Sequence, residues 1–324
     1  LSTISNSEGW VNWLKNVNKT IDDKGSLTLE KKRLFLKEII NKIEIHYNVK
    51  NQSHVVDINF KLPIVGDSLN YTGKVDKKGF KEYKIAEQAI RIYALESALY
   101  RAGQQIDEAT NEFLAKGMND EEAKLKGVEE YAVEAAILKV FGSEVLDFVA
   151  DEGVQIYGGM GYSADAPMER SYRDSRINRI FEGTNEINRM LSVGMLIKKA
   201  MKGHVDLLGP AMKVQEELMG IPSFETPDYS ELFAEEKEMV GKLKKAFLMV
   251  AGAAVQKYGM DLDAHQQLLM AAADMLIEIY VAESTVLRTE KLAKKVGEDK
   301  AKEQIAMAKL YLYKAVDVVS QKGK

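Results

Sequence analysis

The sequence predicts a mainly α-helical protein with a small α+β segment at its N-terminus. The 324 residues include five prolines, and none lies between Pro63 and Pro167. This gap favours long helices, because a proline inside a helix costs about 3 kcal/mol. From about residue 84 onward, apolar residues recur at three- and four-residue steps, as they do in amphipathic helices. Before that point they alternate with polar residues, which is typical of strands.

The composition is that of a folded chain, with 46% hydrophobic and 29% charged residues, and it excludes wholesale disorder. The chain has no cysteine, which excludes a disulfide scaffold and a cysteine nucleophile and suits a cytoplasmic location. The four histidines match no metal-ligand spacing, so no metal site is predicted. No apolar run reaches the length of about 18 residues that a membrane-spanning helix needs. The first residue is Leu, and we expect a piece of a longer protein.

The charge is unevenly distributed. The formal net charge is −4, yet residues 1–85 carry 15 basic and 10 acidic residues, and the remaining residues are acidic overall. A basic head on an acidic body indicates two origins or two roles.

The N-terminal head, residues 1–80, is predicted to be a small α+β segment. Residues 29–42 have the apolar spacing of a helix. Two strand-like runs follow at 43–49 and 54–65, separated by a polar turn, and together they indicate a hairpin. Residues 66–79 then form a polar connector.

The rest of the chain is predicted to be helical in two regions, a bundle over 84–202 and a further helical domain over 203–324. Asn119 or Asp120 is expected to cap one helix and Thr184 another. Residues 203–230 contain three prolines and are predicted to be a connector. Helices are expected over residues 85–109, 120–150, 184–201, 231–258, 263–296 and 298–320.

The stretch 152–190 is the densest in charged and glycine residues. One interpretation is a salt-bridged helix surface without chemistry. Another rests on Glu182, which lies between Phe181 and Gly183 just before an expected helix start. A partly desolvated carboxylate there would have a raised pKa and act as a base toward a weakly acidic C–H. Gly183 would allow a flat ligand or a neighbouring backbone to approach closely.

Three blocks in this stretch resemble the C-terminal signature of the acyl-CoA dehydrogenase family. They are residues 155–162 (QIYGGMGY), 169–174 (ERSYRD) and 181–187 (FEGTNEI). The similarity extends upstream to about residue 84. Downstream, the tail to residue 324 resembles the extra helical region of the longer, very-long-chain-type members.

The resemblance implies a flavoenzyme of fatty acid β-oxidation that introduces an α,β double bond into acyl-CoA thioesters. It implies FAD as the cofactor, an electron-transferring flavoprotein as the electron acceptor, and Glu182 as the catalytic base. Arg189 is expected to steady the Glu182 loop. The glycine-rich loop would meet the FAD of a neighbouring subunit, which implies a dimer or a larger homo-oligomer. The residues that the resemblance places at FAD are Gln155, Gly158, Gly159 and Thr184.

The chain departs from the family pattern by lacking the N-terminal helical domain, the middle β-barrel and the first helix of the C-terminal domain. The flavin and the acyl chain normally lie between those parts and this bundle. We therefore expect a partial module that binds FAD weakly or not at all and does not turn over alone.

The head resembles a different family, the C-terminal end of large serine recombinases, over about 65 residues. This resemblance leaves open an alternative function as a DNA-binding accessory segment, with nucleic acid bound only through residues 1–80. A third alternative is a helical interaction protein without chemistry, to which the Ala- and Met-rich tail would contribute.

Overall fold

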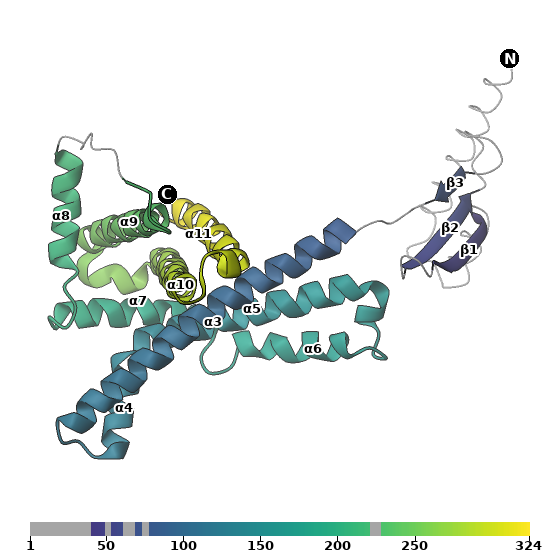
Figure 1. Ribbon diagram of the computed structural model, residues 1–324. Helices are drawn as coiled ribbons and strands as arrows, with labels where there is room; N and C mark the ends of the chain where they lie inside the picture. The colour runs from purple at the N-terminus through teal and green to yellow at the C-terminus, as the bar shows by residue number, and fades with distance from the viewer. Residues whose placement is uncertain (1–39, 49–52, 61–68, 73–77, 221–227) are drawn as a thin grey trace. The chain divides into compact units, whose positions relative to one another are not determined.

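The computed structural model describes residues 40–48, 53–60, 69–72, 78–220 and 228–324. The chain divides into two compact units, residues 1–80 and residues 81–324. Each is described by itself (Figure 1).

The first unit contains an antiparallel sheet in the order β1-β2-β3. β1 spans Ile40–Asn48, β2 spans Ser53–Phe60 and β3 spans Leu69–Thr72. β1 begins inside the range for which the sequence predicts a helix, and the part of that range before residue 40 lies outside the described residues. β3, which pairs with β2, lies where the sequence predicts only a connector. The resemblance of this segment to recombinases remains a prediction.

The second unit is helical, as the sequence predicts. Long helices form because proline is absent from their interiors and because each has a buried apolar stripe. The α-helices are α3 (Lys78–Ala115), α4 (Asp120–Glu130), α5 (Ala132–Tyr157), α6 (Pro167–Arg176), α7 (Asn185–Met201), α8 (Leu208–Met219), α9 (Ala234–Tyr258), α10 (Gln266–Val296) and α11 (Lys302–Lys322). Short 3-10 turns include η1 (Gly158–Tyr162) and η2 (Ile177–Arg179).

Several elements differ from the prediction. Helix α6 lies where no helix is expected, and α3 extends beyond 85–109 at both ends. The helix expected over 120–150 is broken at Tyr131, whose backbone (φ −104°, ψ 30°) leaves the helical range. The connector expected over 203–230 contains helix α8. Pro210 lies in the first turn of α8, where a backbone N–H has no partner within the helix and its loss is tolerated.

One hydrophobic core runs through the helical unit and joins its early and late helices. It includes Val140 of α5, Val193 of α7, Met275 of α10 and Leu312 of α11, all essentially buried. The predicted division at residue 202 is not marked by a separate core, because α7 and α10 share this one. The division into two helical domains remains a prediction.

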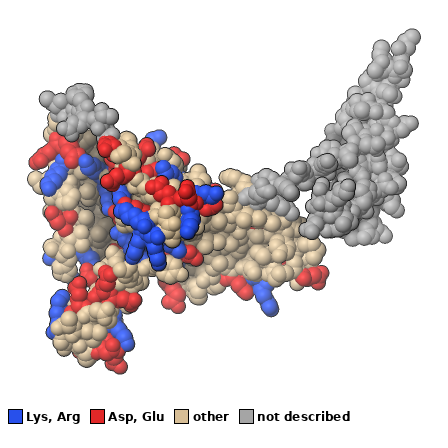
Figure 2. Space-filling view, in the orientation of Figure 1, with Lys and Arg blue, Asp and Glu red and all other residues tan. Residues whose placement is uncertain are grey.

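The surface is charged in some parts and apolar in others. Figure 2 shows few charged side chains over the N-terminal half of α3 and over α5. Exposed apolar side chains there include Tyr83, Ile85 and Leu146. None of the helices within the described ranges has the length and apolar character that crossing a bilayer requires.

Candidate active site

The loop between η2 and α7 has an unusual backbone at Glu182. Its φ is 56°, and Gly183 follows with a φ of 77°. A left-handed conformation costs a non-glycine residue on the order of 1–3 kcal/mol, so it persists only where the surroundings enforce it. Glu182 is thus held in a defined place just before α7 begins.

Side chains from both neighbouring helices enforce this conformation. The amide of Asn188, in the first turn of α7, donates to the carbonyl oxygens of residues 182, 183 and 184 at 3.2, 2.9 and 3.1 Å. Lys139 of α5 donates to the carbonyl of Gly183 at 2.6 Å. A Cβ at Gly183 would lie 2.9 Å from the Asn188 amide nitrogen. The glycine therefore allows close approach, as expected, but the approaching group is this side chain.

The start of α7 confirms the predicted cap at Thr184. Its hydroxyl accepts a hydrogen bond from the backbone N–H of Ile187 at 3.3 Å. One residue on, Asn185 is buried and its amide nitrogen donates to Ser143 Oγ at 2.9 Å. Lys139 also donates to Asn185 Oδ1 at 2.9 Å. The first turn of α7 is thereby fixed onto α5.

A cavity of about 270 Å³ lies between this loop and α5. Phe181 and Glu182 form one side of it. Its other lining residues are Leu138, Lys139, Gly142, Ser143, Leu146 and Asn178. The loop and α5 thus place a carboxylate, an ammonium group and apolar side chains around one small space.

The Glu182 side chain is exposed in this chain, and so is Phe181. The partial desolvation predicted from the apolar neighbour is therefore not supplied by the described residues. Glu186, four residues further on, is also exposed, and the backbone N–H of its own residue and the Thr184 hydroxyl hold its pKa below the usual range.

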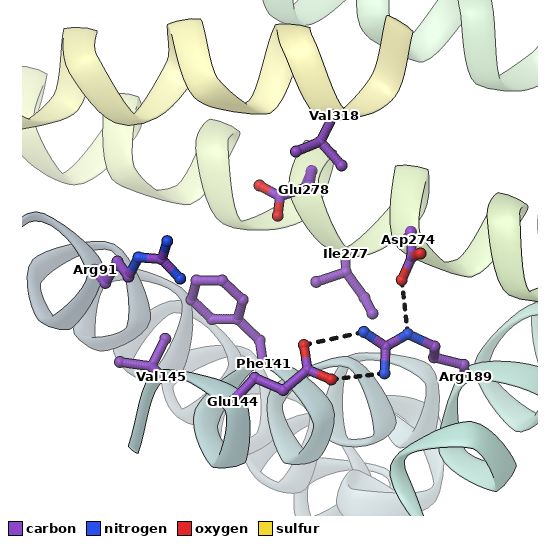
Figure 3. Close-up of a pocket in the computed structure, with 9 residues that line it drawn as sticks. All are labelled: Arg91, Phe141, Glu144, Val145, Arg189, Asp274, Ile277, Glu278 and Val318. Atoms are coloured by element: carbon purple, nitrogen blue, oxygen red, sulfur yellow. Dashed lines mark hydrogen bonds and ion pairs between the residues drawn. The ribbon is translucent and has the colours of Figure 1, made fainter. Parts of the chain in front are cut away.

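Arg189 joins three helices next to this site. It forms two parallel hydrogen bonds to Glu144 of α5, at 2.8 and 3.0 Å, and a third from Nε to Asp274 of α10, at 2.6 Å. Figure 3 shows its guanidinium between the two carboxylates. Although burial opposes it, these bonds hold the pKa of Arg189 above its usual range. The guanidinium therefore has a structural role toward the helix that carries the loop.

A cavity of about 220 Å³ next to Arg189 is lined by both charged and apolar residues (Figure 3). Glu278 of α10 lines it and accepts a hydrogen bond from the Tyr311 hydroxyl at 2.8 Å. Burial raises the pKa of the Glu278 carboxyl. Burial, and next the Glu278 charge, raises the pKa of Tyr311.

The structure places the glycine-rich loop away from Glu182. Leu146 lines the Glu182 cavity, whereas Gln155 follows nine residues later on α5, about 14 Å along the helix. Gln155, Gly158 and Gly159 are exposed. A Cβ at either glycine would meet no heavy atom within 4 Å. The two glycines thus leave an open edge at the end of α5, with the Gln155 carboxamide on the preceding turn.

A larger cavity contains none of the predicted site residues. It has a volume of about 760 Å³ and lies between α7, α8 and α9. Its lining is almost entirely apolar and includes Leu196, Leu208, Phe247 and Val255.

Several site residues were not found from the sequence. Asn185 and Asn188 lie within the recognised motif, but their side-chain roles depend on the left-handed loop, which has no sequence signal at Glu182. Lys139 and Glu144 lie on α5 about 40 residues earlier. Asp274 lies 85 residues after Arg189, and no local pattern could connect the two.

Comparison with known families agrees with the resemblance seen in the sequence. Residues 78–195 and residues 242–324 match two families that are both described as the C-terminal domain of acyl-CoA dehydrogenase.

Among curated proteins, the chain is 41% identical over 265 residues to a probable acyl-CoA dehydrogenase of Bacillus subtilis. The match covers 82% of this chain and 42% of that protein. It is 31% identical over 225 residues to the very long-chain specific enzyme of Bos taurus, over 64% of this chain and 31% of that protein. Kinship with the very-long-chain type is therefore distant. The chain spans about two fifths or less of the length of these relatives.

Among solved structures, an acyl-CoA dehydrogenase complexed with FAD from Bacillus anthracis is similar, with a TM-score of 0.68 and 43% identity. The match covers 74% of this chain and 40% of that one. An acyl-CoA oxidase of Yarrowia lipolytica shares the fold, with a TM-score of 0.57 and 16% identity. The helical part of this chain belongs to the acyl-CoA dehydrogenase family.

Proposed function

We propose that this chain is the C-terminal part of an FAD-dependent acyl-CoA dehydrogenase and that Glu182 is its catalytic base. The observation that carries the proposal is the strained Glu182 backbone, which Asn188 and Lys139 hold beside a cavity at the position of the family signature. Strained residues of this kind cluster at functional sites.

In this mechanism a carboxylate oxygen of Glu182 takes the α-proton of the acyl thioester. Bound FAD would supply the hydride acceptor for the β-hydrogen, and the substrate would thereby gain an α,β double bond. Hydrogen bonds to the thioester oxygen stabilise the negative charge that develops on it. Parts of the longer protein that cover the exposed Glu182 would desolvate its carboxylate and strengthen it as a base.

Gln155, Gly158, Gly159 and Thr184 would hold FAD. The exposed glycine edge supports contact with a flavin carried by a second subunit, and hence a dimer or larger assembly. An electron-transferring flavoprotein as acceptor rests on the family resemblance.

The proposal predicts that the chain alone binds FAD weakly and does not turn over, because the covering parts are supplied by the rest of a full-length enzyme. Its test is a fusion of residues 78–324 to the N-terminal part of the Bacillus subtilis relative. Glu182→Gln should retain FAD and acyl-CoA binding but lose flavin bleaching on addition of acyl-CoA.

The matched control is Glu186→Gln, which removes a neighbouring exposed carboxylate and should still bleach. Bleaching at an unchanged rate in the Glu182→Gln fusion would assign the base to another residue. Bleaching lost equally in both variants would indicate a general effect on the loop.

A further inference from the structure

The loop that carries Glu182 is linked to the C-terminal helices by an ion pair at Asp274. This residue lies on α10, and its carboxylate oxygens lie 2.6 Å from Arg189 Nε and 2.7 Å from Lys322 Nζ. The side chains of Asp274 and Arg189 are only 16% and 14% exposed. A pair with so little contact with water is weakly screened, so the attraction between its charges is stronger than in a surface ion pair.

The link continues from Arg189 into α5. The guanidinium holds both oxygens of Glu144, so two carboxylates fix its plane from two edges. A bidentate arginine pair is specific in direction as well as in charge. Rotation of Arg189 would therefore break several bonds together.

The last hydrogen bonds of this series reach the Glu182 loop itself. Glu144 Oε1 accepts a hydrogen bond from the Asn185 amide at 3.2 Å, and Asn185 Oδ1 accepts one from Lys139 at 2.9 Å. The same ammonium binds the carbonyl oxygen of Gly183. A continuous series of charge-assisted bonds thus runs from α10 to the residue beside Glu182.

From this geometry we propose that Asp274 is a positioning residue for the Glu182 loop and acts through Arg189. The C-terminal helical region then does more than extend the core, because it orients the loop that carries the base. The catalytic meaning of this role rests on the proposed function, whereas the physical coupling does not.

Hydrogen exchange of the 324-residue chain, followed by mass spectrometry, tests the coupling without flavin or substrate. The probes are backbone amides bonded within the loop and the first turn of α7, those of Phe181, Ile187 and Asn188. Asp274→Asn should speed exchange of the peptide 177–190 about tenfold, a size within the range found along coupled networks. The peptide 119–130, in α4, should be unchanged.

Two variants separate positioning from simple stability. Glu290 also lies on α10, is 13% exposed and pairs with two lysines, Lys237 and Lys294, each at 2.7 Å. Glu290→Gln should therefore disturb α10 as much, yet leave peptide 177–190 unchanged. Asp274→Glu keeps the charge and should restore most of the protection.

If Asp274→Asn does not fold, Arg189→Lys takes its place, because lysine keeps a positive charge but cannot bind both carboxylates in a fork. It too should speed exchange of peptide 177–190. Unchanged exchange of this peptide, or equal acceleration by Glu290→Gln, would overturn the proposal.

In the flavin-loaded fusion, Asp274→Asn should slow bleaching while acyl-CoA affinity is kept. If Asp274→Asn does not speed exchange of peptide 177–190, the coupling is refuted. If it speeds exchange but does not slow bleaching, only the catalytic role of the loop is refuted.

Discussion

The ammonium group of Lys139 lies 2.6 Å from the carbonyl oxygen of Gly183. This bond ties a loop with two consecutive left-handed residues to the N-terminal half of α5. Because the same ammonium also binds Asn185, a single side chain fixes both the loop and the start of α7.

Lys139→Met should therefore lower the free energy of unfolding by about 1 kcal/mol, the size of a partly exposed charge-assisted hydrogen bond. Urea unfolding followed by circular dichroism measures this change. Lys126→Met removes an exposed lysine that binds Glu129 on the same helix and should leave the midpoint unchanged. Equal effects of the two substitutions would mean that the Gly183 bond does not stabilise the fold.

Gly183→Ala should destabilise the chain by roughly 1–3 kcal/mol, because alanine is strained at a φ of 77°. The added Cβ would also crowd the Asn188 amide, which could no longer hold the loop. Gly194→Ala, within α7 where a Cβ meets nothing within 4 Å, should instead stabilise by up to about 1 kcal/mol. Thermal unfolding of both variants provides the comparison, and changes of the same sign would contradict this account of Gly183.

Glu278 should make the free energy of unfolding depend on pH. Burial raises the pKa of this carboxyl in the folded chain above its usual value of about 4.5. The folded state then holds the proton more tightly than the unfolded state, so stability decreases as pH rises from 4.5 through the raised value. Glu278→Gln should be more stable than the natural chain at pH 7, and the advantage should shrink toward pH 4.

Glu283, also on α10, provides a control because the pKa of its carboxyl is shifted in the opposite direction. Burial alone would raise the pKa of its carboxyl, but hydrogen bonds and charges from Lys244 and Arg101 lower it overall. The ionised Glu283 carboxylate stabilises the fold at pH 7, and this stabilisation is lost as pH falls through the lowered pKa. Glu283→Gln should therefore destabilise at pH 7, with no difference at strongly acidic pH. Urea unfolding at a series of pH values separates the two profiles, and profiles of the same sign would contradict the assigned environments.

The shared core predicts that the early helices do not fold alone. Val193 of α7 and Met275 of α10 belong to one buried cluster, so truncation after residue 202 would expose a large apolar surface. We expect residues 78–202 to lack a cooperative thermal transition and to aggregate, whereas residues 78–324 unfold cooperatively. A cooperative transition of the short fragment would show that the late helices are an appendage.

Much of the helical architecture could be predicted because it follows local rules. The start of α7 has a cap residue, Thr184, followed by an acidic first turn, and proline-free apolar repeats mark the long helices. The break at Tyr131 could not be predicted, because no glycine or proline lies there. Helix α8 was missed because Pro210 is tolerated in a first turn.

The site was predictable where the signature is contiguous and not where it depends on distant contacts. Glu182 and Thr184 lie in one heptapeptide block, so their proximity follows from the chain. The contact between Arg189 and Asp274 joins residues 85 positions apart, and only the packing of α7 on α10 creates it. The exposure of Glu182 also escaped prediction, because the apolar residues beside it are exposed as well.

The most direct test of the central claim measures proton removal apart from hydride transfer. An acyl-CoA analogue with sulfur at the β position retains α-hydrogens but cannot lose a β-hydride. In deuterated water, the flavin-loaded fusion carrying residues 78–324 should exchange these α-hydrogens, and Glu182→Gln should slow the exchange by at least about 100-fold, the lower end of general base catalysis. Exchange at the same rate in both proteins would contradict the role assigned to Glu182.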